Sequence, residues 1–459
     1  MAMVAPAEVE RMARKPPRHS WRPPGMNVKL AALLSVVIAL SACAPAASLG
    51  GDVGLARAGV ARASADPADA VRAGTAVDAF GLDLYRAMAA GQANLVFSPA
   101  SITLALAMAR AGARGVTASE MDAVMHGAAA DDHAGWLNAL DQALATRSGT
   151  FQDGSGKDVP ITLRIANAPF AQQGMPLEKT YLEALAGRFS GGLRLVDYES
   201  QTEQARALIN GWVDTQTEHR IPELLVPGVL TRATRLTLVN AIYLKAPWET
   251  PFPVDATTAG TFTRADGSTV QVPFMATTTS LRYATGSGWR AVEIPYVGGS
   301  LAMTIIVPDD LAAFESKLTA DSFTAITGAL SDTEVALALP KFGIETKTDL
   351  ASTLAALGMP SAFDDRADFS GITTAEPLEI SDVIHQANID VDENGTEAAA
   401  ATAVVIRATG MPAEPVTLRV DRPFLFALRD VPTGSILFLG RVGDPSVARW
   451  HPRRAHREG

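Results

Sequence analysis

The stretch ENGTEAAAATAVVIRATGMP, residues 393–412, carries signals for two different local structures. It begins with turn residues, continues through the alanines 398–401, and becomes β-branched at Val404, Val405 and Ile406. Alanine favours helices, whereas β-branched residues favour strands. The stretch therefore does not commit to one structure, and the surrounding sequence has to decide what it is for.

Written as a β-strand, the stretch has two very different faces, because side chains alternate along a strand. One face is uncharged and consists of Thr396, Ala398, Ala400, Thr402, Val404, Ile406 and Ala408. The other face holds every charge of the stretch and consists of Glu393, Glu397, Ala399, Ala401, Ala403, Val405 and Arg407. Only the first face can pack on a core, so a charge is expected to be harmful at Thr396 and much milder at Glu397.

Six segments place this stretch in a known context. They are NLVFSPASI (Asn94–Ile102), LVNAIYLKAPWETPF (Leu238–Phe252), LPKFGIETKTDL (Leu339–Leu350), DFSGIT (Asp368–Thr373), HQANIDVDENGTEAAAATA (His385–Ala403) and DRPFLFALRD (Asp421–Asp430). Each resembles a core segment of the serpin family, and they occur in serpin order across residues 71–445. The resemblance implies an α+β serpin fold with about nine helices and three β-sheets. It also implies an exposed reactive-centre loop at about residues 393–415.

The resemblance implies a suicide-substrate inhibitor of serine proteases, with cysteine proteases also open as targets, and not an enzyme. The protease cuts the loop and forms an acyl-enzyme, and the cut loop then inserts into the main sheet as a new strand. The hinge that inserts first corresponds to Glu393, Gly395, Thr396, Glu397, Ala398, Ala399, Ala400, Ala401 and Thr402. Its small residues favour inhibition over the alternative, a non-inhibitory serpin that acts as a binding or carrier protein at the cell envelope.

The family's hinge spacing places the cleaved bond at Thr409–Gly410. A small β-branched residue at this position suits elastase- or subtilisin-like proteases. The alternative is cleavage at Arg407–Ala408, which would suit a trypsin-like protease.

Further positions match residues that support the sheet in serpins. Ser98, Ser101, Asn240 and His385 are expected to form a polar latch beneath the path of insertion. Trp248 and Lys341 are expected where the loop enters the sheet, with Lys341 paired to Glu393. A catalytic reading of Ser98 and His385 is disfavoured, because no nucleophile elbow or oxyanion motif accompanies them.

Composition limits the other functions. The chain has 459 residues, of which 47% are hydrophobic, and a net charge of −10. A nucleic-acid partner is not expected, because binding phosphates requires a basic surface. The seven histidines show no metal-binding spacing, so neither a metal nor another cofactor is expected. The expected partner is a target endopeptidase, bound by a monomeric inhibitor.

The N-terminal sequence predicts an export signal that begins at Met26. Residues 1–25 are then expected to precede the true start of translation. Lys29 is followed by an apolar run over residues 31–40 and then by LSAC, which ends at Cys43. This pattern resembles a bacterial lipoprotein signal, in which the cysteine is lipidated, so residues 1–43 form the signal region. The alternative is an ordinary secretory signal. Either way the protein is expected outside the cytoplasm, secreted or held at a membrane by the lipid alone.

The segments that flank the domain are expected to be simple. Residues 44–70 are rich in small residues and predict a flexible tether. Residues 446–459 form a basic tail with four arginines and two histidines, which is either solvated or in contact with anionic lipid or wall polymer. Within the domain, helical spacing is predicted over residues 75–90 and 203–221, and TASE at Thr117–Glu120 fits a capping box.

Overall fold

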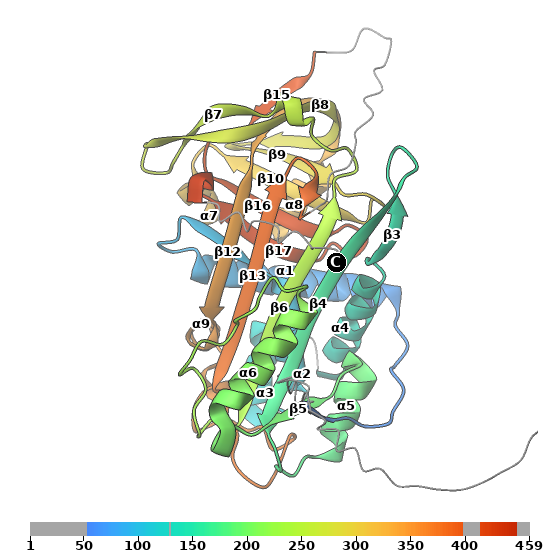
Figure 1. Ribbon diagram of the computed structural model, residues 1–459, viewed down its shortest axis with the longest axis vertical. Coiled ribbons are helices and arrows are strands. Elements are labelled where there is room, and N and C mark those ends of the chain that lie inside the picture. Colours follow the sequence, from blue (N-terminus) through green and yellow to red (C-terminus); the bar gives the residue numbers. More distant parts are fainter. Residues whose placement is uncertain (1–52, 128–129, 398–413, 448–459) are drawn as a thin grey trace, which may run out of the picture. The chain divides into compact units, whose positions relative to one another are not determined.

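The structure is a computed structural model that describes residues 53–127, 130–397 and 414–447. Helices are concentrated in the N-terminal part of these residues and strands in the remainder (Figure 1). The α-helices described are α1 (Pro67–Met88), α2 (Pro99–Arg110), α3 (Gly115–Val124), α4 (Ala130–Ala145), α5 (Lys179–Phe189), α6 (Tyr198–Gln216), α7 (Leu311–Glu315), α8 (Ala320–Ala329) and α9 (Ala351–Leu357). Three short 3-10 helices are η1 (Val254–Ala256), η2 (Pro360–Ala362) and η3 (Pro445–Val447).

The main sheet contains eight strands in the order β1-β5-β4-β6-β14-β13-β12, with β3 paired to β4. Its strands are β1 (Gly54–Ala56), β3 (Gly149–Gln152), β4 (Asp158–Gln172), β5 (Leu193–Val196), β6 (Leu236–Pro247), β12 (Phe342–Asp349), β13 (Asp382–Asp392) and β14 (Gly395–Thr396). The long strands β4, β6, β13 and β12 run side by side in Figure 1, and α6 lies across β4 and β6. One face of these strands packs on the large core over α2, and the other on a smaller core under α6.

The second sheet contains nine strands in the order β15-β11-β8-β9-β10-β16-β17-β2, with β7 paired to β8. Its strands are β2 (Asn94–Phe97), β7 (Thr258–Thr263), β8 (Thr269–Gly286), β9 (Trp289–Pro295), β10 (Leu301–Pro308), β11 (Ser331–Pro340), β15 (Val416–Arg419), β16 (Phe424–Asp430) and β17 (Ile436–Val442). The 18-residue β8 pairs with β11 along one part and with β9 at its end. Two of the three expected sheets are therefore joined through β8.

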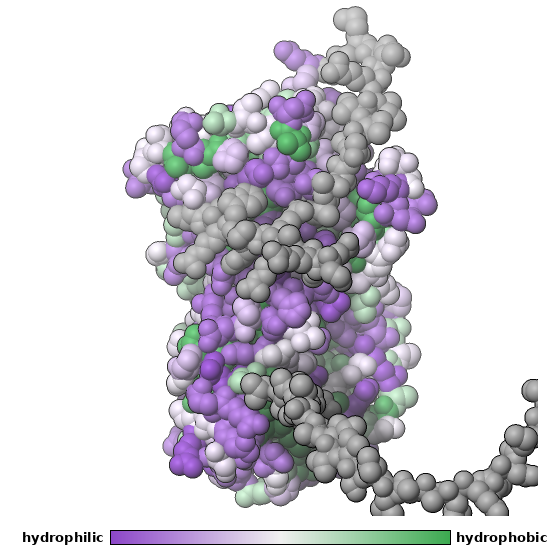
Figure 2. All heavy atoms as spheres, viewed as in Figure 1, coloured by the Kyte–Doolittle hydropathy of each residue, from purple (hydrophilic) through white to green (hydrophobic). Residues whose placement is uncertain are grey.

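Local sequence explains how the elements beneath the site begin. Ser98 caps α2 by accepting a hydrogen bond from the Ser101 backbone at 3.1 Å, and Pro99 occupies the first turn, where its missing N–H costs nothing. Asp66 and Pro67 start α1 in the same way. The face that carries α6 is largely hydrophilic where described residues cover it (Figure 2). None of the described helices has the length and apolarity needed to span a bilayer.

The predicted tether over residues 44–70 is wrong in its second half. Strand β1 pairs with β5, and the Arg62 guanidinium bonds both Asn138 and Asp141 on α4. Helix α1 then begins at Pro67. The small residues that resemble a linker are held by backbone hydrogen bonds, which side-chain composition does not reveal.

Two local predictions also differ from the structure. The helix predicted over residues 203–221 spans Tyr198–Gln216 and ends earlier, because Glu218 and His219 take positive φ values of 52° and 62°. The capping box at Thr117–Glu120 is not formed, since α3 already begins at Gly115. The Thr117 hydroxyl instead accepts a hydrogen bond from the Asp368 N–H.

Candidate functional site: a fork in the main sheet

The main sheet opens between its two central strands. Residues 382–387 of β13 pair in parallel with residues 237–242 of β6, and we call this the seam. Beyond the seam the strands separate, and β14 lies between them, antiparallel to both. Thr396 is opposite Val391 on one side and Ala246 on the other. We call the region where β14 separates β6 and β13 the fork.

Gly395 makes this close approach sterically feasible. Its φ is +145°, and a Cβ at this position would lie 2.2 Å from the Ala246 carbonyl oxygen and 2.7 Å from the Pro247 Cα. Both contacts are with backbone, which cannot move aside as a flexible side chain could. Glycine is therefore required if the hinge is to occupy the fork.

Thr396 turns its side chain toward the main core and is 2% exposed. Its hydroxyl is 2.6 Å from the Tyr296 hydroxyl, and burial raises the pKa of Tyr296. The Tyr296 ring stacks on Trp248 with ring centroids 4.4 Å apart. The Trp248 indole N–H donates to the Asp392 carbonyl at 3.0 Å, so these aromatic rings support the turn that leads into β14.

Glu393 is fixed at the same turn and is 6% exposed. Its carboxylate accepts bonds from the Lys341 ammonium and from the Thr257 hydroxyl, each at 2.8 Å. Burial works to raise the pKa of Glu393, but these donors outweigh it and hold the pKa below its usual value. The predicted ion pair between Lys341 and Glu393 is therefore present. It is also largely buried, which the sequence alone did not indicate.

Glu397 follows β14 and is held in an unusual way. Its φ is +51°, its N–H donates to the Asp390 carbonyl at 3.2 Å, and its side chain is only 3% exposed. Arg220 Nη2 lies 3.0 Å from Glu397 Oε2 and forms an ion pair with it. Burial raises the pKa of Glu397 to about 7 despite Arg220. In the uncut chain Glu397 is therefore buried under the segment that follows α6, although the alternation of side chains placed it on the face without a core.

The four predicted latch residues meet beneath the seam. His385 Nε2 accepts from the Ser98 N–H at 3.1 Å, and its Nδ1–H donates to the side-chain amide oxygen of Asn240. The Asn240 amide donates to the Ser101 hydroxyl at 2.6 Å. Burial lowers the pKa of His385 to about 3, so the ring is neutral and its two nitrogens have opposite roles.

Asn167 on β4 completes this network, although it was not among the latch residues predicted from the sequence. It accepts from the Asn240 amide at 2.5 Å and donates to the Ser101 carbonyl at 2.9 Å. Asn167 is opposite Asn240 in the ladder, and Asn240 is opposite His385. The latch therefore crosses three strands at one level. A detectable signal was the single polar residue on the inward face of the apolar strand ITLRIANAPF.

Three further residues of the fork had no clear sequence signal. Tyr296, Thr257 and Arg220 come from separate loops and strands, and only the fold brings them to β14. The predicted hinge residues Ala398, Ala399, Ala400, Ala401 and Thr402 lie outside the described residues. So do the alternative cleavage sites at Arg407–Ala408 and Thr409–Gly410, the lipidation site Cys43, and the tail from residue 448 onward.

The main sheet thus holds two hinge residues, Gly395 and Thr396, between two central strands that run parallel to each other. Comparison with known families agrees: residues 75–445 match the family described as serpin (serine protease inhibitor). The chain belongs to the serpin family.

Individual relatives cover most of the chain. An uncharacterized serpin-like protein of Thermococcus kodakarensis is 40% identical over 374 residues, which are 81% of this chain and 85% of that protein. Human leukocyte elastase inhibitor is 34% identical over 80% of this chain and 97% of its own length. The native-state crystal structure of the thermophilic serpin tengpin matches with a TM-score of 0.74 and 28% identity, over 85% of this chain and 97% of tengpin.

Proposed function

We propose that this serpin inhibits proteases by inserting its cleaved reactive loop into the main sheet and trapping the acyl-enzyme. The observation that carries the proposal is β14 itself, which lies between β6 and β13 in the uncut chain. The sequence places Thr396 among the residues that insert after cleavage, whereas here it is already in the sheet. Insertion after cleavage would therefore continue from Glu397 onward.

The strand directions supply a driving force for that continuation. Along the seam, six residues of β13 pair in parallel with six of β6. A strand that extends β14 would replace this one parallel interface with two antiparallel ones, and antiparallel pairing is slightly more stable per residue. It would also bury the uncharged face of the loop. The uncut protein would then be kinetically trapped above its most stable state.

The names of the relatives support a serine protease as target, since several are leukocyte elastase inhibitors. Cleavage at Thr409–Gly410 fits an elastase- or subtilisin-like enzyme. Cleavage at Arg407–Ala408 would indicate a trypsin-like enzyme, and a cysteine protease is a third candidate. Incubation with a protease panel, followed by mass spectrometry of the released C-terminal peptide, distinguishes these targets.

Two measurements test the trapping mechanism. A covalent complex with the cognate protease should survive boiling in detergent, because an acyl ester joins the chains. The cleaved protein should also unfold at a much higher temperature than the intact protein. Cleavage without a complex, together with equal thermal midpoints, would reject the mechanism and favour the non-inhibitory binding or carrier alternative.

We also propose that the domain works outside the cytoplasm, anchored by lipid on Cys43. The support is the LSAC motif after a short apolar run. Membrane fractionation of the full chain from a bacterial host, compared with Cys43→Ser, tests this. Equal membrane association of both proteins would contradict the anchor.

A further inference from the structure

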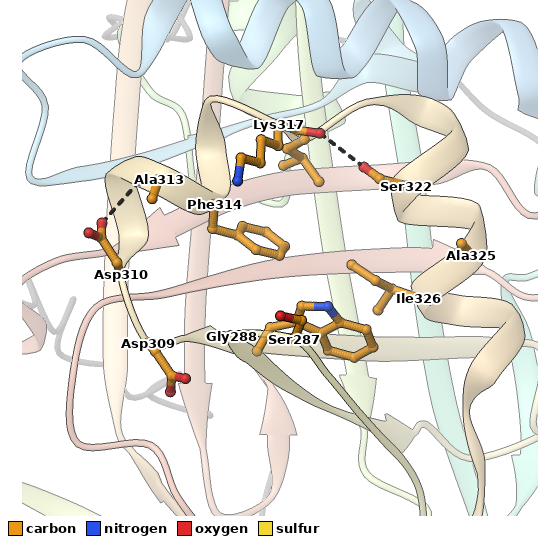
Figure 3. A pocket seen from close by; sticks show the side chains of 12 residues that line it. Ser287, Gly288, Asp309, Asp310, Ala313, Phe314, Lys317, Ser322, Ala325 and Ile326 are labelled. Carbon is orange, nitrogen blue, oxygen red and sulfur yellow. Dashed lines mark hydrogen bonds between the residues drawn. The ribbon is translucent and has the colours of Figure 1, made fainter.

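A second concave site lies away from the fork. A cavity of about 480 Å³ opens between α7, α8 and the turn from β8 to β9, and it shares no residue with the fork. Its volume lies within the range of small-molecule sites, about 300–1,000 Å³. The apolar lining comes from Trp289, Phe314, Leu318 and Ile326. Figure 3 shows Phe314 and Ile326 pointing into the space from different helices.

The apolar walls are well supported by the fold. Leu318 is 2% exposed and Ile326 is 4% exposed, so both are anchored in the core. Trp289 and Phe314 are half-buried and present the remaining aromatic surface to the cavity. Two aromatic residues and an aliphatic wall favour a flat ring system over a flexible chain, because rings stack with little loss of conformational freedom.

The charged residues at the rim indicate the polarity of the ligand. The Asp310 carboxylate accepts from the Ala313 N–H at 3.0 Å and is committed to capping α7. Asp309 and Asp310 lie together at one edge, and Lys317 lies at another (Figure 3). Among the described residues, Lys317 is in no ion pair. Its long stem can bring the ammonium over the cavity mouth.

We propose that this cavity binds a small molecule with an aromatic ring body and one anionic group, which contacts Lys317. The proposal goes beyond protease inhibition and does not depend on it. A ligand seated here would contact α7, α8 and the β8–β9 turn together, and would stabilise their packing.

The test uses the full chain and two fluorescent probes of similar shape. One is 1-anilinonaphthalene-8-sulfonate, which is anionic, and the other is N-phenyl-1-naphthylamine, which is neutral. Ala325→Trp fills the cavity from an exposed position on α8, and Lys317→Gln removes the charge. Lys179→Gln is the control, since this lysine is 86% exposed on α5 and does not line the cavity.

Ala325→Trp should weaken binding of both probes by at least about tenfold, because the space for the rings is lost. Lys317→Gln should weaken only the anionic probe, by up to about fivefold, as for a partly exposed ion pair. Lys179→Gln should change neither. Unchanged binding to a folded Ala325→Trp protein would overturn the site. Equal losses of both probes in Lys317→Gln, or no loss of the anionic probe, would overturn the anionic class of ligand.

Discussion

Thr396→Arg places a charge at the most constrained position of the hinge. Thr396 is 2% exposed, its neighbours in the ladder are Ala246 and Val391, and its side chain faces Tyr296. Among the residues that the structure describes, no acidic side chain bonds the Thr396 side chain. Any state that keeps residue 396 in the sheet must therefore bury an unpaired guanidinium.

Thr396→Arg has two energetic costs, the loss of a hydrogen bond and the burial of a charge, and the larger one sets the size of the effect. Losing the Thr396–Tyr296 hydrogen bond costs only about 1 kcal/mol. Burying an uncompensated charge costs about 3–5 kcal/mol and dominates. In the uncut chain the two-residue strand β14 can leave the fork and avoid this cost. After cleavage, insertion cannot avoid it, and at ~1.4 kcal/mol per tenfold in rate the loop should insert roughly 10² to 10³ times more slowly.

The expected outcome is conversion from inhibitor to substrate. Deacylation should finish before insertion, so the protease cuts the loop and is released. Gel analysis with a cognate protease, scoring trapped complex against cleaved product, measures the partition. Thr396→Ser is the matched control, because it keeps the hydroxyl and adds no bulk, and it should trap protease like the wild type. Efficient trapping by Thr396→Arg would refute the reasoning.

Three further outcomes follow from the same region. Gly395→Ala should drive β14 out of the sheet, because its Cβ would lie 2.2 Å from the Ala246 carbonyl oxygen; wild-type amide-exchange protection at Thr396 would contradict this. Glu397 has a pKa of about 7 in the fork against 4.5 when released, so retention of β14 should be strongest below pH 4.5. The equilibrium constant for keeping β14 in the fork should fall about a hundredfold as the pH rises to 7. Amide exchange at Thr396, corrected for the pH dependence of exchange itself, measures this change. The change should be absent in Glu397→Gln. His385 has a pKa of about 3 when buried against 6.5 when exposed, so the seam should hold best above pH 6.5 and weaken as pH falls toward 3. Loss of inhibitory capacity during incubation should therefore be faster at pH 4 than at pH 7.5, and equal rates would argue against the latch.

Much of the site could be predicted because the residues lie in long segments that resemble serpins. Ser98, Asn240 and His385 are far apart in the sequence, and only a known fold could bring them together. Within that fold, the contact between Asn240 and His385 follows from the register of β6 and β13. Asn167 occupies the same row of the sheet, but its short segment was not among those that carried the resemblance.

What the sequence could not provide is the resting position of the hinge. Alternation tells which face Thr396 presents, but not whether it lies in the sheet before cleavage. That depends on a balance between a few backbone bonds, the fit of Gly395 against β6, and the freedom of the remaining loop. The burial of Glu397 could not be predicted from the sequence either, because it depends on a residue far away in the chain. Arg220 reaches it from the segment after α6, and no local pattern links the two.

The fork and the seam would impose an order on the proposed insertion. Glu397 is the first residue beyond β14, so its contact with Arg220 must separate before the strand can grow. Arg220 lies four residues after the end of α6 and also pairs with Asp390 on β13 at 3.7 Å, so it can stay on the sheet when Glu397 leaves. Only then does the growing strand reach the seam, where Ala387 and Ile242 are the first pair to part and His385–Asn240 parts two residues later. In the proposed mechanism the Glu397 contact would thus govern the start of insertion, and the latch would govern whether a strand that has started can continue.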